Sequence, residues 1–120
     1  MSYDNDNVFA RILRGELPCK KVHETEFALA FEDIQPQTPI HVLVIPKGPY
    51  VDFEDFMAKA SPEEITGFWK SVNETAEVAG VAGEGFRLTT NNGASAGQIV
   101  FHFHVHIFGG RPLGRMVRKD

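Results

Sequence analysis

Residues 101–108 read FHFHVHIF and place three histidines at alternate positions in an otherwise apolar stretch. Successive side chains of a β-strand point to opposite faces, so His102, His104 and His106 are expected to share one face. Phe101, Phe103, Val105 and Ile107 would then pack on the other. The stretch therefore predicts a strand that is part of the core on one face and carries a polar site on the other.

The segments around this strand predict an antiparallel α+β fold in one domain spanning residues 1–120. Asn7 caps an expected helix over 6–15, and Ser61, Pro62 and Glu64 begin a longer one over 61–80. Alternating apolar residues predict a hairpin over 20–33, and the other expected strands cover 40–46, 85–93 and 99–110.

Composition and charge narrow the class of protein. The net charge of -4 lacks the basic surface of a general nucleic-acid binder, and no apolar run approaches the 20 or so residues of a membrane span. The polar N-terminus does not resemble a secretion signal, and the lone Cys19 cannot form an intramolecular disulfide. We therefore expect a cytoplasmic protein with no nucleic-acid or membrane partner.

The three histidines have two simple explanations, a metal site or structural packing. At about 3.3 Å per residue, His102 and His106 lie roughly 13 Å apart along a strand, whereas metal–nitrogen bonds are about 2 Å. Convergence of all three on one ion would be strained, so no metal is expected. Purely structural packing explains a single histidine well, but each of three aligned imidazoles needs its own matched donor and acceptor.

A third explanation combines the histidines with the preceding loop, NNGASAGQ, residues 91–98. Its glycines and small residues allow close backbone approach to a ligand and can direct N–H groups at an anion. A neutral imidazole is a good nucleophile near pH 7, and a neighbouring imidazole can transfer a proton or bind a phosphate oxygen. Loop and strand together favour chemistry at phosphorus.

These residues resemble the histidine triad (HIT) superfamily, and within it the Hint branch of purine nucleoside phosphoramidases. The resemblance rests on four blocks in order: VFARILRGELP (8–18), LAFEDIQPQTPIHVLVIPK (29–47), TTNNGASAGQ (89–98) and HFHVHIFGGR (102–111). It implies a five-stranded antiparallel sheet with two helices, paired into a two-fold homodimer through the long helix and an edge strand. It implies no cofactor.

The resemblance also implies a role for particular residues. His104 would be the nucleophile and form a nucleotidyl-histidine intermediate, His106 and His102 would orient it and contact phosphate, and His41 would complete the cluster. Asn91, Gly97 and Gln98 would line the phosphate pocket, and Asp33 would bind the ribose hydroxyls, although it is also placed to begin a turn. The base would be held by Phe9, Ile12, Phe31, Ile34 and Leu43.

One position departs from the family pattern. Ile99 follows Gln98 where Hint relatives often carry a hydroxyl residue near the leaving group, so only the backbone N–H of Ile99 is available there. The expected activity is hydrolysis of a purine nucleoside phosphoramidate. The alternatives are a dinucleoside polyphosphate hydrolase, which uses the same nucleophile, and a nucleotide-binding scaffold with little turnover. The DNA-end-processing branch is disfavoured because zinc-finger cysteines and a basic surface are missing.

Overall fold

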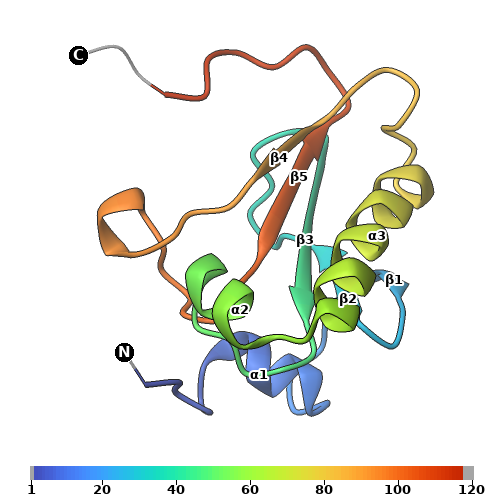
Figure 1. Ribbon diagram of the computed structural model, residues 1–120. Coiled ribbons are helices and arrows are strands. Elements are labelled where there is room, and N and C mark those ends of the chain that lie inside the picture. The colour runs from blue at the N-terminus through green and yellow to red at the C-terminus, as the bar shows by residue number, and fades with distance from the viewer. Residues whose placement is uncertain (1, 118–120) are drawn as a thin grey trace.

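A computed structural model describes residues 2–117 of the chain. Three α-helices, one short 3₁₀ helix and five strands follow one another along the sequence (Figure 1). They are α1 (Val8–Leu13), β1 (Lys21–Glu24), β2 (Ala28–Glu32), β3 (Ile40–Pro46), α2 (Phe53–Lys59), α3 (Pro62–Val78), β4 (Arg87–Thr89), η1 (Ala94–Ala96) and β5 (Val105–Gly109).

The five strands form one antiparallel sheet in the order β1-β2-β3-β5-β4. The expected α+β class and five-stranded antiparallel sheet are therefore confirmed. β3 and β5 lie at its centre, and their register pairs His41 with Phe108 and Leu43 with His106. Residues directly opposite each other in adjacent strands share a face, so these four side chains form one contiguous surface.

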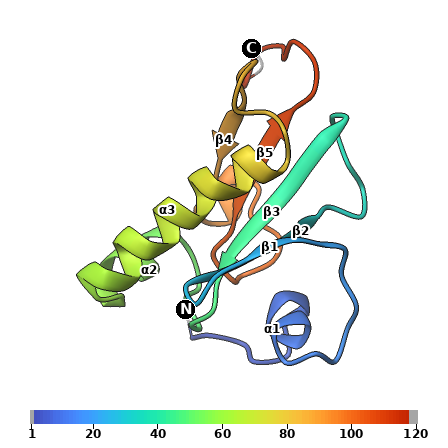
Figure 2. The same cartoon turned by 90° about the vertical axis from the view of Figure 1, so that its right-hand side faces the viewer.

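Both faces of the sheet are covered, each by a different helix. Figure 2 shows α3 on one side of the sheet and α1 on the other. Val42, Val44, Val105 and Ile107 pack into the core beneath α3, together with the fully buried Phe103. Leu29, Phe31, Leu43 and Ile45 pack with Phe9 of α1 in a second, smaller core. The alternation along β2 and β3 thus separates two apolar layers, and the histidines belong to the α1 side.

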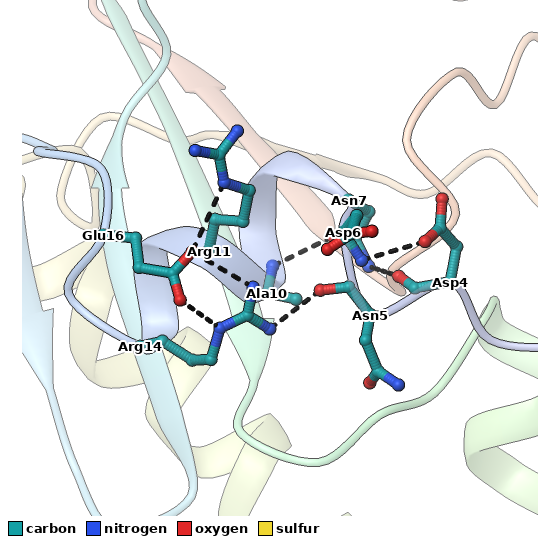
Figure 3. A network of polar contacts seen from close by, with 8 residues as sticks. All are labelled: Asp4, Asn5, Asp6, Asn7, Ala10, Arg11, Arg14 and Glu16. Carbon is teal, nitrogen blue, oxygen red and sulfur yellow. Dashed lines mark hydrogen bonds and ion pairs between the residues drawn. The ribbon is translucent and has the colours of Figure 1, made fainter.

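The polar residues around α1 fix this short helix at the edge of the second core (Figure 3). Asn7 caps it as expected, since its side-chain oxygen accepts a hydrogen bond of 2.9 Å from the backbone N–H of Ala10. At the other end Arg14 donates to the carbonyl of Asn5 over 2.7 Å and pairs with Glu16 over 2.7 Å. Six residues form too short a helix to persist alone, so these contacts and the packing of Phe9 hold it.

The long helix also begins as the sequence predicts. Ser61 and Glu64 form a capping box with Pro62 in the first turn. The helix ends at Val78, close to Gly80, whose φ of 83° suits a residue without a Cβ.

Three elements differ from the expectation. The strand expected over 85–93 is shorter and covers only Arg87–Thr89. The strand expected over 99–110 is hydrogen-bonded into the sheet only from Val105, because the segment before it bonds elsewhere: the N–H of Phe103 donates to the carbonyl of Tyr50 over 2.8 Å. The expected two helices are joined by a third, α2, which begins at the N-cap Asp52 and has acidic residues in its first turn. Within residues 2–117, no helix is long and apolar enough to cross a membrane.

Candidate active site

A cavity of about 420 Å³ lies on the α1 side of the sheet. One wall is apolar and comes from α1, β2 and β3, and the other carries the histidines and the loop before them. The lining residues are Val8, Phe9, Ile12, Pro18, Cys19, Phe31, Glu32, Asp33, Ile34, Gln35, Gln37, Leu43, Asn91, Gly97, Ile99, Val100, His104 and His106. The cavity brings together every site residue expected from the sequence except His41, His102 and Gln98, which lie behind its surface.

His104 presents one ring nitrogen to this cavity. Its Nδ1 lies 2.8 Å from the backbone carbonyl of His102, and because a carbonyl only accepts, Nδ1 carries the proton. The lone pair is then on Nε2. Burial lowers the pKa of His104 from its ordinary value, against a smaller raising effect of the carbonyl and of Asp33. The imidazole is therefore neutral at pH 7 and offers an unprotonated nitrogen.

His106 is set in the opposite tautomer through His41. The backbone N–H of Gln37 donates to Nδ1 of His41 over 3.1 Å, which leaves the His41 proton on Nε2. That nitrogen lies 2.9 Å from Nδ1 of His106 and donates to it. The proton of His106 is thus on Nε2, as a donor beside the nucleophile. Burial, followed by the neighbouring His104 and His41, lowers the pKa of His106 to about 4.

His102 does not face the cavity. It is fully buried, Nδ1 accepts from the hydroxyl of Tyr3 over 2.6 Å, and Nε2 donates to the carbonyl of Pro46 over 2.9 Å. Burial lowers its pKa to about 4, so it stays neutral. Both ring nitrogens of His102, which was expected to contact phosphate, are thus hydrogen-bonded within the fold. His102 acts on the site through its backbone carbonyl, which orients His104.

Gln98 is also occupied within the fold. Its Oε1 accepts from the N–H of Gly93 over 2.8 Å, and its Nε2 donates to the carbonyls of Val51 and Val100 over 2.8 and 3.1 Å. The side chain, expected to line the phosphate pocket, thus fastens the loop to the segment just before α2. The buried amide of Gln98 is therefore satisfied within the fold by its own loop and by the segment before α2.

The loop over 91–98 forms a more self-contained turn than the sequence suggested. The N–H groups of Ala96, Gly97 and Gln98 all donate back to carbonyls of Gly93 or Ala94. The expected row of N–H donors is therefore directed into the loop. Within residues 2–117, the next N–H along the chain, that of Ile99, has no hydrogen-bond partner and adjoins the cavity.

Asp33 has the turn-forming role weighed from its sequence position and also lies at the cavity. Oδ1 accepts from the N–H of Gln35 over 2.8 Å and closes the turn after β2, while Oδ2 lies 3.4 Å from Nε2 of His41. The carboxylate also lines the cavity. Its negative charge raises the pKa values of His41, His104 and His106, but less than burial lowers them.

Asp33, His41 and His106 are also the group in residues 2–117 whose ligand atoms are close enough for a metal ion, all within 4.8 Å of one another. Only one member belongs to the alternating triad. The hydrogen bond between His41 and His106 accounts for their closeness without an ion.

Sequence reasoning missed several contributors to the site. Val8 lies one helical turn from Ile12, so its spacing was a usable signal. Cys19 lines the cavity from the segment after α1, and Tyr3 and the backbone of Gln37 fix two imidazoles. Tyr3 is 99 residues from its partner, and a backbone N–H leaves no trace in the sequence.

The antiparallel sheet thus carries a buried imidazole cluster on its central strands beside an apolar pocket, and comparison with known proteins gives the family. The HIT domain model matches residues 14–113. The chain is 58% identical to a HIT-like protein of Azospirillum brasilense over 118 residues, covering 98% of this chain and 97% of that protein. It is 38% identical to the purine nucleoside phosphoramidase of Escherichia coli over 113 residues, covering 93% of each.

A solved structure agrees. The HIT family hydrolase from Clostridium thermocellum superimposes with a TM-score of 0.82 at 36% identity, covering 96% of this chain and 99% of that one. The chain belongs to the HIT family.

Proposed function

We propose that this chain hydrolyses purine nucleoside phosphoramidates through a nucleotidyl intermediate on His104. The observation that carries the proposal is the fixed tautomer of His104, whose Nδ1–H donates to the carbonyl of His102 and whose Nε2 is left as a nucleophile at the cavity. The similarity to the E. coli purine nucleoside phosphoramidase supports the substrate class.

The lining of the cavity suits the parts of such a substrate. Phe9, Ile12, Phe31, Ile34 and Leu43 offer an apolar slot for the base. Asp33, at the polar end of this slot, accepts hydrogen bonds from the ribose hydroxyls. Asn91, Gly97 and the two imidazoles that line the cavity, those of His104 and His106, lie where the phosphate would follow.

The reaction proceeds in two displacements at phosphorus. Nε2 of His104 attacks, the P–N bond to the amine breaks with its electron pair going to the amine nitrogen, and a nucleotidyl-histidine forms. The leaving amine nitrogen takes its proton from water, because Ile99 has no side-chain donor and His106 is a neutral imidazole that donates a hydrogen bond but has no proton to give up. Water then attacks phosphorus, the P–Nε2 bond breaks, and a nucleoside monophosphate and a proton are released. The Nε2–H of His106 stabilises the charge on the phosphate oxygens.

The decisive experiment is to incubate the protein with adenosine 5'-phosphoramidate labelled in the adenosine, quench it in base, and map the label by mass spectrometry. An adenylyl group on His104 is expected. His104→Ala should lose turnover while retaining nucleotide binding, and His23→Gln, which removes an imidazole from the opposite face, should behave as the unaltered protein. Label on another residue, or full turnover by His104→Ala, would refute the assignment.

We also infer that the chain forms a homodimer through α3 and β4. β4 is an edge strand of only three residues, and it exposes Leu88, while α3 exposes Val78. An unpaired edge with apolar residues is suited to pairing with a second copy. Light scattering after size exclusion should give twice the chain mass, and Leu88→Lys should reduce it.

A further inference from the structure

A second hollow adjoins the proposed nucleotide pocket on the same side of the sheet. It has a volume of about 520 Å³ and is formed by β4, the end of β5 and the chain after it. His106, Asn91 and Gln37 line both hollows, whereas His104 lines only the nucleotide pocket. The hollow, here called the arginine groove, therefore starts where the phosphate would lie and leads away from the base.

The strand register places an arginine one step beyond His106. On β4, Thr89 is directly opposite His106 and Arg87 is directly opposite Phe108. Opposed residues share a face, and a diagonal neighbour is about 7–8 Å away between Cα atoms, within reach of a long side chain. Arg87 is half-buried in this position and lines the groove. Its guanidinium can thus reach a group attached to a phosphate at His106.

The groove concentrates positive charge in an acidic protein. Arg87, Arg111 and Arg115 line it, although the chain has a net charge of -4. No carboxylate is among the described residues that line the groove, and none of the three arginines is in an ion pair within residues 2–117. Arg111 uses one nitrogen to donate to the carbonyl of Pro112 over 2.9 Å. The guanidinium groups of the three arginines therefore have no anionic partner within residues 2–117 and can bind an anion in the groove.

We propose that the arginine groove binds the leaving group of the substrate and selects leaving groups that carry a negative charge. The inference rests on the proposed function, because the leaving group is defined by a phosphate at His104 and His106. A substituent on that phosphate extends past His106 toward Arg87. Guanidinium groups pair with carboxylates in a two-pronged geometry, so an amine bearing carboxylates fits. A further phosphate shares this chemistry, as in a dinucleoside polyphosphate.

The test compares two adenosine phosphoramidates of nearly equal size, one made from aspartic acid and one from its diamide. Unaltered protein should show a kcat/KM ratio of about fivefold or more in favour of the acid, the size of effect that one moderately exposed ion pair supplies. Arg87→Gln, and Arg87→Gln combined with Arg111→Gln and Arg115→Gln, should bring the ratio toward one. Lys70→Gln removes one positive charge from α3 across the sheet and should leave the ratio unchanged.

A second arm uses diadenosine triphosphate to separate the two sources of negative charge. Two results together would assign the groove to phosphate: the arginine variants lose turnover of diadenosine triphosphate, and unaltered protein has nearly equal kcat/KM values for the acid and the diamide. A ratio near one together with diadenosine triphosphate turnover that is insensitive to the three substitutions would overturn the proposal.

A binding measurement distinguishes failure of the groove from failure of the proposed activity. Calorimetry with His104→Ala protein gives the Kd of the acid and of the diamide without turnover. Tighter binding of the acid, lost in the Arg87→Gln background, supports the groove even if unaltered protein turns over none of these compounds. Equal binding that the arginine substitutions do not change refutes it, whatever the turnover.

Discussion

Nε2 of His41 lies 2.9 Å from Nδ1 of His106, and this contact decides which nitrogen of His106 carries its proton. His41 is itself fixed by the N–H of Gln37. A backbone group of the turn after β2 is thus connected, through two imidazoles, to a donor in the cavity. His104 is fixed separately, by the carbonyl of His102. The two histidines at the cavity therefore offer complementary groups, a lone pair and an N–H.

The role of His41 as a positioning residue predicts a difference between two substitutions. His41→Gln keeps an amide N–H that can donate to His106, whereas His41→Ala removes the donor. We expect kcat to fall about 10–100-fold in His41→Ala, as for other groups that orient a functional histidine, and less in His41→Gln. The pH dependence of kcat should also change in His41→Ala, since loss of a neighbouring imidazole alters the titration of His106. Equal activity of both variants at all pH values would exclude this role.

Tyr3 is predicted to stabilise the protein through His102. Tyr3→Phe leaves Nδ1 of a fully buried imidazole without its donor. An unsatisfied buried polar group costs about 1–3 kcal/mol, so the free energy of unfolding in urea should fall by that amount. In the double variant Tyr3→Phe, His102→Phe, the loss attributable to Tyr3 should shrink, because no nitrogen is left unpaired. Additive losses would show that the hydroxyl acts independently of His102.

The buried imidazoles predict a loss of stability in mild acid. The pKa values of His102 and His106 are about 4 in the folded chain, below the ordinary value of 6.5. The unfolded chain therefore binds more protons between those limits, so stability is fully present above about pH 6.5 and falls as pH decreases toward 4. For His102 alone, the shift corresponds to roughly 3 kcal/mol. Urea unfolding between pH 7.5 and 4.5 measures it.

The control for this pH dependence is the slope in His102→Phe protein. It should be shallower than in unaltered protein, because a buried imidazole that must stay neutral has been removed. A stability that is level down to pH 5 in unaltered protein would contradict the buried neutral imidazoles.

The sequence predicted the elements whose signals are local. Ser61 with Glu64 and the cap at Asn7 identified two helices, and alternation identified the faces of the residues in β2 and β5. Alternation does not determine depth, however. His102 and His104 share a side of the chain, yet only His104 reaches the cavity, because Tyr3 and Pro46 enclose the other.

Distant contacts explain what the sequence could not show. β5 begins at Val105, later than expected, because the N–H of Phe103 donates a hydrogen bond to Tyr50, 53 residues earlier in the chain. In the same way, the side chain of Gln98 donates a hydrogen bond to the carbonyl of Val51. α2, in contrast, could have been predicted from the sequence, because the N-cap Asp52 and the acidic residues of the first turn are a local signal. The tautomers of His41 and His104 depend on the backbone N–H of Gln37 and the carbonyl of His102, which nearly any residue other than proline would provide equally.

Ile99 is predicted to limit the range of leaving groups. Ile99 is 87% exposed at the edge of the cavity. Its side chain has no hydrogen-bond donor that could protonate the amine as the P–N bond breaks. Ile99→Ser places a hydroxyl there, and because the position is exposed, stability should change by less than about 0.5 kcal/mol. Proton transfer from a positioned group contributes about 10²–10⁴-fold, so even a partial contribution should raise kcat/KM for adenosine phosphoramidates of strongly basic alkylamines about tenfold. Phosphoramidates of weakly basic arylamines, which leave without protonation, should gain little.

Ile99→Ala separates the effect of the hydroxyl from the loss of bulk, because it opens the same space without a donor. An equal gain in the alanine and serine variants, or a gain that does not depend on the basicity of the amine, would show that Ile99 limits access to the cavity rather than protonation of the leaving group.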